Sequence, residues 1–510
     1  MPTVTEGEVV ATLSLAADLG FGLPLESGLV VSAVALDVGE RMGLDAAELD
    51  RVHLLALLRH IGCTANSDEA AAFSTDEITL RRTAPLLDLA NKPALLPHML
   101  RLISATTPPA GRPKALLRML ATAGSAAAAS AAAVCEAATV LAGRIGIGAE
   151  TIADLNVYYE RWDGKGLIGT ASGDEIPAPV QAVQVAESAH GHALAGGVDA
   201  AAAFVRRHAG TLFAPPAARA FLDAPPDVLA AGDAPGLWEA ALARLPSPLP
   251  AERLDATFDV VADFADLRSV WLGGHSRGVA ALAAEAGRLS GLPVSDIESL
   301  RRAGLVHDLG RVAVSARVWG KQGPLTTAEW DDVRLHPYHV ERVLARVEAL
   351  APLGRLASFH HERCDGSGYF RGTRELSSPA RLLAAADALH AMTEARPHRP
   401  ARSLEAAAVE LRAGVRAGRF DGDAAECALA AAGAGGRRRE LPGGLSPREV
   451  EVLRLLARGC TKRQVAAELV IAPKTADAHV QHIYSKLGVS TRAGATLFAM
   501  QHGLLDSLAS

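Results

Sequence analysis

At 510 residues, the chain is too long for a single hydrophobic core and is expected to form roughly three domains. Aromatic residues make up only 4% of it, alternating Val, Thr and Ile runs are almost absent, and the five cysteines form no CxxC pair, which argues against a β-rich fold, a disulfide framework and a cysteine zinc site. The net charge of -6 is uneven, because residues 441–510 carry eight Arg or Lys against five Asp or Glu, so only this tail has the sign that favours nucleic acid.

The start of the chain carries no sign of export. The stretch MPTVTEGEVVATLSL lacks a basic start and an apolar block with a cleavage site. Residues 123–142 are the one candidate for a membrane span, but alanine is only weakly apolar and Glu136 lies inside the stretch. We therefore expect a cytoplasmic protein without a membrane segment, in a compartment that keeps its cysteines reduced.

The first 430 residues contain two diverged copies of one unit. At an offset of 248, residues 28–62 align with residues 276–310 without a gap. Further on, YYERWDGKG (158–166) aligns with HHERCDGSG (360–368), and Pro-rich and Gly/Arg-rich breaks mark the edges of the units. The predicted domains are a first unit at 1–210, a Pro-rich linker at 211–250, a second unit at 251–430, a Gly/Arg linker at 431–444 and a tail domain at 445–510.

Seven histidine and aspartate side chains in the second copy carry the strongest chemical signal. A lone histidine is usually a capping or solvent-facing residue, and a lone aspartate is an ordinary helix residue, so the prediction depends on their joint occurrence. Nitrogen and oxygen ligands without cysteine suit iron, manganese or a similar divalent ion, and seven ligands are enough for two ions. The predicted metal ligands are His275, His307, Asp308, His336, His360, His361 and Asp387.

Residues 255–420 resemble the HD-GYP family, a group of HD-domain metal phosphohydrolases associated with cyclic di-GMP hydrolysis. The motifs HSRGVA, HDLG, HP, HHERCDGSGY, ADAL and RPHRP occur in the family's order. The resemblance implies an all-α bundle in which Asp308 bridges two metals. It implies that one metal is held by His275, His307 and Asp387, and the other by His336, His360 and His361. Such a pair of ions activates a water molecule to attack a phosphodiester.

Three positions depart from the family's pattern. Phe370 replaces the final proline of G-Y-P, which bears on specificity for cyclic di-GMP. Arg311 replaces a lysine; it is predicted to act with Asp308 in catalysis by holding a phosphate, but it is a poor proton donor because its pKa exceeds about 12. Trp271 stands where some relatives add an acidic ligand, so two metals are expected rather than three.

The first copy keeps the loop of the HHERCDGSG motif but not the ligands. Its residues at the aligned positions are Ser27, Arg59, His60, Tyr158, Tyr159 and Glu187, with Val134 near the place of His336. Only His60 and Glu187 among them favour an ion, and two ligands are too few for a dinuclear site. We expect this degenerate HD-like unit to serve packing or dimerisation, with ligand sensing as the alternative.

The tail contains four short helical patterns. Ser446, followed by Pro447 and Glu449, predicts a capped helix start, and Thr461 with Gln464 predicts a second. The third pattern runs from 474 to 487 and the fourth from 492 to 503. A small helical dimerisation module would show the same features.

The tail also resembles the LuxR-type helix-turn-helix domain, through LSPREVEVL, PKTADAHV and KLGV. The resemblance implies that the third helix enters the major groove of double-stranded DNA. Lys474, Thr475 and Lys486 are then predicted to contact phosphates. The residues predicted to face the bases are Asp477, Ala478 and Gln481. Ala472 replaces the usual serine cap of this helix, so binding is expected to need a homodimer.

The sequence thus favours an all-α protein with two HD-type bundles in tandem and a four-helix LuxR-type tail. Its leading interpretation is a transcriptional regulator that carries a dinuclear phosphohydrolase or sensor domain for a cyclic dinucleotide or another phosphodiester. A second interpretation is a metal-dependent cyclic di-GMP phosphodiesterase whose tail only localises it. A third is a switch that binds the nucleotide without hydrolysis.

Overall fold

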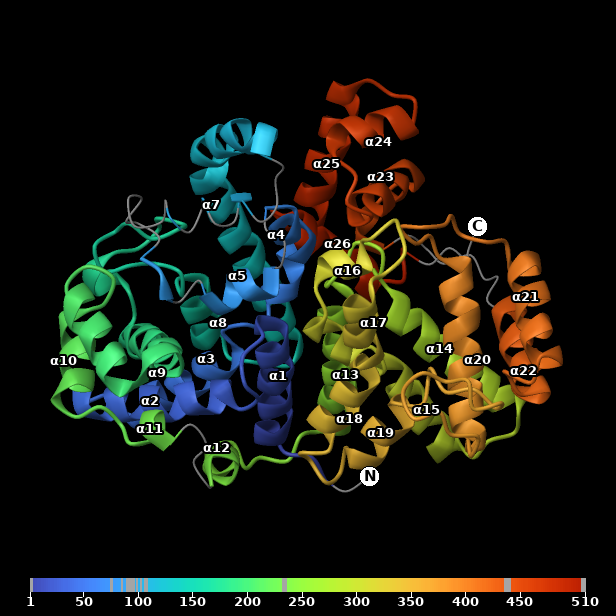
Figure 1. Cartoon of the computed structure of the whole chain (residues 1–510), viewed down its shortest axis with the longest axis horizontal. Coiled ribbons are helices and arrows are strands. Elements are labelled where there is room, and N and C mark those ends of the chain that lie inside the picture. Colours follow the sequence, from blue (N-terminus) through green and yellow to red (C-terminus); the bar gives the residue numbers. More distant parts are fainter. Residues whose placement is uncertain are drawn as a thin grey trace. The chain divides into compact units, whose positions relative to one another are not determined.

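The computed structural model describes residues 3–73, 77–83, 86–88, 97, 100, 103–104, 109–231, 236–434 and 442–505. Within these residues the regular elements are all helices, joined by turns and three isolated bridges, which confirms the all-α prediction (Figure 1). The chain divides into two compact units, residues 3–250 and residues 251–510. No helix in the described residues is long and apolar enough to cross a membrane.

The first unit is built around α2 and α9, which pack against each other and against α3. Gly22 ends α1 and Gly43 ends α2, both in the left-handed conformation that favours glycine. The helices of this unit are α1 (Glu6–Phe21), α2 (Ser27–Met42), α3 (Ala46–Leu58), η1 (Cys63–Asn66), α4 (Ser67–Phe73), α5 (Glu77–Thr83), η3 (Pro109–Gly111), α7 (Arg112–Arg144), α8 (Ala149–Asn156), η4 (Gly173–Glu175), α9 (Ala178–His208), α10 (Pro215–Asp223), α11 (Val228–Ala231) and α12 (Leu237–Arg244).

The prediction of a linker at 211–250 is wrong for most of that stretch. Three helices, α10 to α12, occupy it, and they pack on α9, α2 and α1 as part of the first unit. The proline-rich stretch suggested a break because proline ends helices, but proline is also favoured in the first turn of a helix, where its missing N–H has no partner to lose. Pro215 starts α10 in this way. Residues 232–235 lie outside the described part of the chain.

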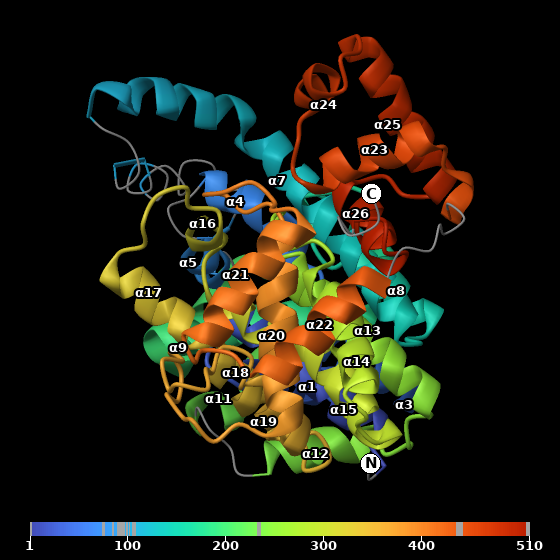
Figure 2. The ribbon, with the colours of Figure 1, turned by 90° about the vertical axis from the view of Figure 1, so that its right-hand side faces the viewer.

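The second unit places α14 at the centre of a bundle, in contact with α15, α20 and α22 (Figure 2). Its helices before the tail are α13 (Ala251–Asp266), α14 (His275–Leu289), α15 (Val294–Val306), η5 (Leu309–Ala313), α16 (Ala316–Trp319), α17 (Thr327–Arg334), α18 (His336–Leu344), α19 (Ala351–Ala357), α20 (Ser378–Thr393), α21 (Leu404–Arg416) and α22 (Gly422–Ala434). Helix α22 extends into the predicted Gly/Arg linker at 431–444, and residues 435–441 of that linker lie outside the described residues.

Each unit contains the same close backbone contact. A Cβ atom on Gly62 would lie 2.0 Å from the carbonyl oxygen of Val134, and one on Gly310 would lie 2.0 Å from the carbonyl oxygen of His336. Only glycine fits at such a distance. The contact makes Val134 the structural counterpart of His336, the pairing that the sequence suggested.

The tail folds as four helices around a core of its own. They are α23 (Pro447–Ala457), α24 (Lys462–Glu468), α25 (Pro473–Leu487) and α26 (Arg492–Gln501), and the short 3-10 helix η6 (Pro442–Gly444) precedes them. The capping boxes predicted at Ser446 and Thr461 are both present. Ala472 provides no side-chain cap for α25, as expected, and Gly488 ends that helix in the left-handed conformation.

Candidate metal centre

The seven predicted ligands lie together in the second unit, mostly at helix ends. They are the first residue of α14 (His275), the two residues after α15 (His307 and Asp308), the first residue of α18 (His336), two residues shortly after α19 (His360 and His361) and one residue within α20 (Asp387). All are buried except His361, whose side chain is 16% exposed. The ends of four helices and the interior of α20 thus converge on one polar interior.

Asp308 lies at the centre of this cluster, with one carboxylate oxygen turned to each side. Its Oδ2 is 3.4 Å from Nε2 of His275 and 3.1 Å from Nε2 of His307. Its Oδ1 is 3.7 Å from Nε2 of His336 and 3.6 Å from Nε2 of His360. A carboxylate in this position is suited to bridge two cations.

The histidines form two groups on either side of Asp308. Within each group, potential ligand atoms lie within 4.8 Å of one another, and the groups are His275 with His307 and Asp308, and His336 with His360 and His361. Asp387 reaches toward both. Its Oδ1 is 3.3 Å from Nε2 of His275, and its Oδ2 is 3.8 Å from Nδ1 of His361.

The polar atoms that face the centre fit a pair of cations. In the described part of the chain, five of these buried atoms make no hydrogen bond, although Oδ2 of Asp308 forms an ion pair with Arg311: Nε2 of His275, Nε2 of His307, both carboxylate oxygens of Asp308, and Oδ1 of Asp387. Buried polar atoms without hydrogen-bond partners are costly and rare. Five of them in one place therefore call for an explanation. Divalent ions would satisfy all five.

Backbone contacts fix three of the histidine rings in the form that binds metal. Nδ1 of His307 donates to the carbonyl oxygen of Gly304 at 2.7 Å, and Nδ1 of His336 donates to that of Val333 at 2.6 Å. His360 makes the same contact with Ala357 at 2.7 Å. The proton therefore stays on Nδ1, and the lone pair of Nε2 points to the centre.

The charge states also suit metal binding. Burial lowers the pKa of His336 to about 4 and holds that of His360 and His361 well below its usual range, so these rings are neutral at pH 7. Burial alone would raise the pKa of Asp308, but Arg311 and His307 outweigh it and hold that pKa well below its usual range. His275 differs: burial opposes its protonation, but Glu394 and Asp387 outweigh burial and raise its pKa to about 9, so this ring must release a proton to bind a metal. The site thus combines three neutral imidazoles, one protonated imidazole and an anionic carboxylate.

Glu394 belongs to this site and was not predicted from the sequence. Its Oε2 accepts from Nδ1 of His275 at 2.8 Å, so a carboxylate orients this ring where the other rings use a backbone carbonyl. Arg396 donates to the same oxygen at 2.7 Å. His275, His390 and Glu394 could themselves hold a cation, but the Arg396 guanidinium, 3.4 Å from Nδ1 of His275, already supplies the positive charge there.

The sequence offered one signal for Glu394, its spacing from Asp387. Seven residues correspond to two helical turns, which place both side chains on the same face.

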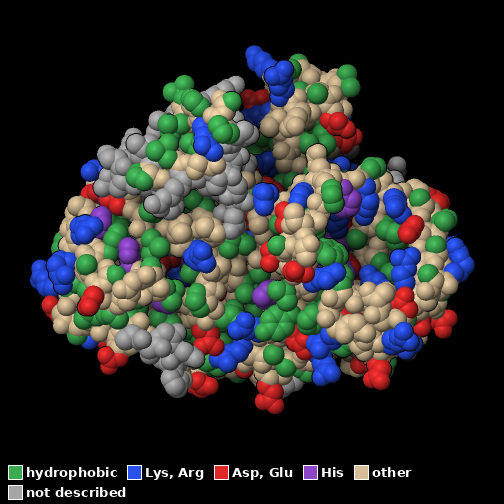
Figure 3. All heavy atoms as spheres, in the orientation of Figure 1, with side chains coloured by type: hydrophobic (Ala, Val, Ile, Leu, Met, Phe, Trp, Pro, Cys, Tyr) green, Lys and Arg blue, Asp and Glu red, His purple; other side chains and the backbone are tan. Residues whose placement is uncertain are grey.

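Of the side chains predicted to face DNA, some are exposed and others are held by ion pairs within the tail. Lys474, Thr475, Ala478 and Gln481 are exposed on α25, and Lys and Arg side chains lie at the outer end of the domain (Figure 3). Asp477 forms an ion pair with Lys462, which offsets its repulsion of phosphate. Lys486 donates to Glu449 at 2.7 Å and to the carbonyl oxygen of Gly444 at 3.0 Å, so it is held within the domain.

Comparison with known families matches two parts of the chain. Residues 259–424 match the model of the HD domain, and residues 444–499 match that of the bacterial regulatory proteins of the luxR family. The chain carries an HD domain and a LuxR-family domain. The first match encloses all seven predicted ligands, and the second encloses α23 to α25.

Curated relatives of the HD domain include proteins named as phosphodiesterases. The 3'3'-cGAMP-specific phosphodiesterase 3 of Vibrio cholerae is 24% identical over 409 residues, which are 78% of this chain and 89% of that protein. A cyclic di-GMP phosphodiesterase of Thermotoga maritima is 32% identical over 141 residues, 27% of this chain and 38% of that one. The LuxR-family domain is 53% identical over 62 residues to the probable transcriptional regulatory protein NarL of Mycobacterium tuberculosis, 12% of this chain and 29% of that one.

A solved structure shares the fold. The crystal structure of a cyclic GMP-AMP specific phosphodiesterase of V. cholerae aligns with a TM-score of 0.58 at 21% identity, over 84% of this chain and 98% of that one. At this identity the likeness establishes the fold alone. Its extent includes much more than the HD domain, so the degenerate unit belongs to the shared architecture.

Replacing Glu394 with glutamine tests its role in positioning His275 of the HD domain. An amide oriented by Arg396 cannot match the carboxylate as an acceptor for Nδ1–H, so metal affinity should fall about 10- to 100-fold. The measurement is competition of the metal-loaded full-length chain with a chelator of known affinity. Glu348→Gln, at an exposed position of the same domain, is the matched control. Equal affinity in the wild type and the Glu394 variant would contradict the assignment.

In the degenerate first unit, protein charges occupy the region that corresponds to the metal ligands. Arg59, aligned with His307, has its Nε 3.3 Å from Oε1 of Glu187, and His60 has its Nε2 2.7 Å from the same oxygen. The hydroxyl of Tyr158 donates to Oε2 of Glu187. Burial opposes ionisation, but His60 and Arg59 together hold the pKa of Glu187 below its usual range. A guanidinium therefore supplies the buried positive charge here, and the described residues of this unit contain no three-ligand metal group.

Proposed function

We propose that this protein is a DNA-binding transcriptional regulator whose HD domain binds two divalent ions, iron or manganese, and acts on a cyclic dinucleotide. The main support for the two ions is the set of buried candidate ligand atoms at and around Asp308 that make no hydrogen bond within the described residues. Relatives whose names specify cyclic dinucleotide phosphodiesterases support the substrate class. The LuxR-family domain supports DNA as the partner.

Two bound ions would lower the pKa of a water between them and neutralise charge that develops on the phosphate. The chain's own contribution begins with Arg311. Its guanidinium lies 2.8 Å from Oδ2 of Asp308 and 5.0 Å from the ring of Trp319, and it is 7% exposed. Since arginine stays protonated, it can bind a phosphate oxygen but cannot deliver a proton. The leaving oxygen would then take its proton from water.

The loop after the double histidine is fixed by Glu362. This buried carboxylate accepts from the backbone N–H of Arg371 at 2.7 Å and of Thr373 at 3.2 Å. A Cβ atom on Gly368 would lie 2.6 Å from the Cα of Glu362, so glycine is required there. The first copy uses Glu160 in the same way, since it accepts from the backbone N–H of Thr170 at 2.7 Å. The loop residues that the two copies share therefore stabilise the turn and are not expected to take part in metal binding or hydrolysis.

Phe370, which departs from the family's G-Y-P pattern, has ring contacts with Tyr338 and Arg371. Its ring centroid lies 6.4 Å from that of Tyr338, and the Arg371 guanidinium covers it at 4.9 Å. The neighbouring Tyr369 is the residue whose ring meets His361, at 4.6 Å. Of these two neighbouring rings, it is thus that of Tyr369, which keeps the family's residue, that contacts a predicted ligand. This favours retention of a cyclic dinucleotide as the substrate.

A second candidate function is nucleotide binding without hydrolysis. The observation that favours it is the 2.8 Å ion pair between Arg311 and Asp308, because a fixed cation on the bridging carboxylate weakens its charge toward a metal. Hydrolysis by the metal-loaded protein distinguishes the two functions. A bound nucleotide that is recovered intact would favour the switch.

The DNA-binding part of the proposal is tested on Lys474. We propose that a homodimer places two copies of α25 in the major groove, with Lys474 on a phosphate. Lys474→Ala should weaken binding of a random-sequence duplex and reduce the slope of log affinity against log salt by about 1. Fluorescence anisotropy of the full-length chain measures both quantities. Lys486→Ala is the comparison, since Glu449 already holds that side chain, and a chain ending at residue 441 should not bind. An unchanged salt slope for Lys474→Ala would remove this contact.

A further inference from the structure

A row of aromatic rings leads from the candidate metal centre to the surface of α17. The ring centroids of His361 and Tyr369 are 4.6 Å apart, and those of Tyr369 and Trp330 are 5.6 Å apart. Trp330 is 37% exposed, more than any of the other four tryptophans of the chain. Tryptophan is enriched at binding interfaces because its large ring buries apolar area while its N–H can still donate a hydrogen bond.

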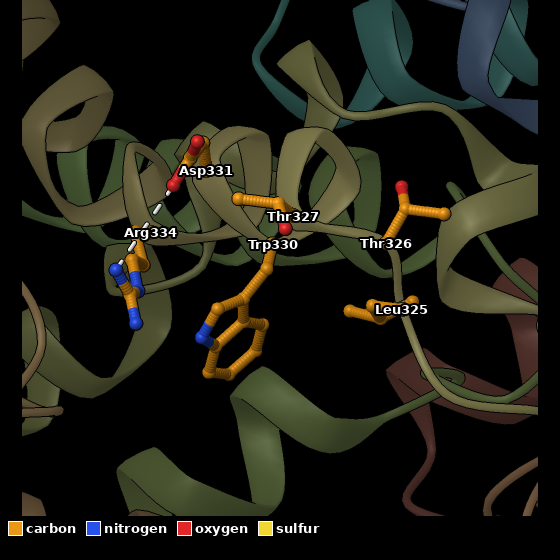
Figure 4. A pocket seen from close by; sticks show the side chains of 6 residues that line it. All are labelled: Leu325, Thr326, Thr327, Trp330, Asp331 and Arg334. Carbon is orange, nitrogen blue, oxygen red and sulfur yellow. Dashed lines mark ion pairs between the residues drawn. The ribbon is translucent and has the colours of Figure 1, made fainter.

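A shallow hollow of about 440 Å³, mostly open to solvent, lies at this exposed indole. We call its lining the Trp330 platform, and its residues are Leu325, Thr326, Thr327, Trp330, Asp331 and Arg334. In Figure 4 the indole and the side chain of Leu325 point to the same side of α17. The Arg334 guanidinium lies 5.5 Å from the indole centroid and 4.0 Å from the Asp331 carboxylate.

The helix that carries the platform is held rigidly. Thr326 and Glu329 form a capping box at the start of α17. Glu329 also pairs with Lys321 at 2.5 Å. Val333 packs against Val314 and Val318, and Leu325 of the platform packs against the same cluster. The platform is therefore formed before any ligand arrives, which lowers the cost of binding.

We propose that the Trp330 platform binds a guanine base of the substrate while the adjoining phosphodiester lies at the metal ligands. An indole face stacks on any base, and such stacking is worth about 1–3 kcal/mol. Arg334 selects guanine, because its paired N–H donors match the O6 and N7 acceptors of guanine, whereas adenine presents a donor at the neighbouring position. This inference rests on the proposed function, since it names the part of the substrate that the same site recognises.

The test compares a substrate with bases and one without. Trp330→Ala in the metal-loaded full-length chain should raise KM for cyclic di-GMP about 5- to 150-fold, the range that the stacking energy implies. It should leave hydrolysis of bis(2,2,2-trifluoroethyl) phosphate, a phosphodiester without a base or any other ring that could stack, unchanged. Trp330→Phe should recover part of the affinity, and Leu289→Ala, at an exposed apolar position at the end of α14, is the control for surface loss.

Arg334→Ala tests the base preference separately. The wild type should favour cyclic di-GMP over cyclic di-AMP, and the variant should lose at least about tenfold of that preference, as a lost bidentate contact predicts. Equal effects of Trp330→Ala on both types of substrate, or no effect on either, would overturn the platform.

The proposed function fails in a different way. A wild type that hydrolyses neither substrate would contradict the phosphodiesterase. Calorimetric titration with cyclic di-GMP would still decide on the platform, through the ratio of dissociation constants of the wild type and Trp330→Ala.

Discussion

Asp308→Asn is expected to abolish phosphodiester hydrolysis and to leave fewer than two metal ions per chain. The two oxygens of Asp308 face different pairs of histidines at 3.1 to 3.7 Å, and an amide offers only one neutral oxygen to the two sides. The lost stabilisation of several kcal/mol corresponds to a decrease in kcat of about a thousandfold or more. Steady-state kinetics and elemental analysis of the same sample measure the two effects.

Asp423→Asn, at an exposed position in the first turn of α22, is the matched control and should retain activity and metal. An Asp308→Asn protein with two ions and wild-type kcat would show that the bridging position lies elsewhere. If the variant loses its metal but keeps its affinity for DNA, the two activities are separable.

Arg59→Ala is expected to destabilise the first unit by about 3–5 kcal/mol, the usual cost of leaving a buried charge without its partner. Arg59 is 3% exposed and pairs with Glu187, and it also lies near the buried carboxyl of Asp18, whose pKa burial raises to about 7. Urea unfolding followed by hydrogen exchange in α3 and α9 measures the loss in this unit alone.

The double variant Arg59→Met/Glu187→Gln removes both charges and keeps an acceptor for Tyr158 and His60, so it should recover much of the lost stability. A double variant as unstable as the single one would contradict the proposed charge pairing. Because the pKa of Glu187 is held below its ordinary value of 4.5, its contribution is complete above that value and is lost as the pH falls toward the lower pKa.

The sequence predicted the all-α fold and the capping boxes of the tail because these depend on local residue types. The seven ligand residues were also visible, since each motif contains its own chemistry, and the structure brings all seven together around Asp308. Their role as ligands stays a prediction. The helical content of 211–250 was missed because the same prolines that suggest a linker can also start a helix, as Pro215 does.

Contacts between side chains far apart in the chain could not be predicted from the sequence. Glu394 carries no motif; its spacing from Asp387 could suggest that it lies near the site, but its role follows from its 2.8 Å contact with His275 across the bundle. Alignment placed Arg59 and Glu187 at ligand positions but could not show that they neutralise each other. The exposure of Trp330 likewise depends on how the loop with Tyr369 packs.

The most direct measurement is hydrolysis of cyclic di-GMP and 3'3'-cGAMP by the full-length protein, reconstituted anaerobically with iron or manganese and assayed with its metal content known. The account predicts linear dinucleotide from at least one of them in the presence of two ions per chain, and none after chelation. No product from either substrate with both ions bound would contradict it.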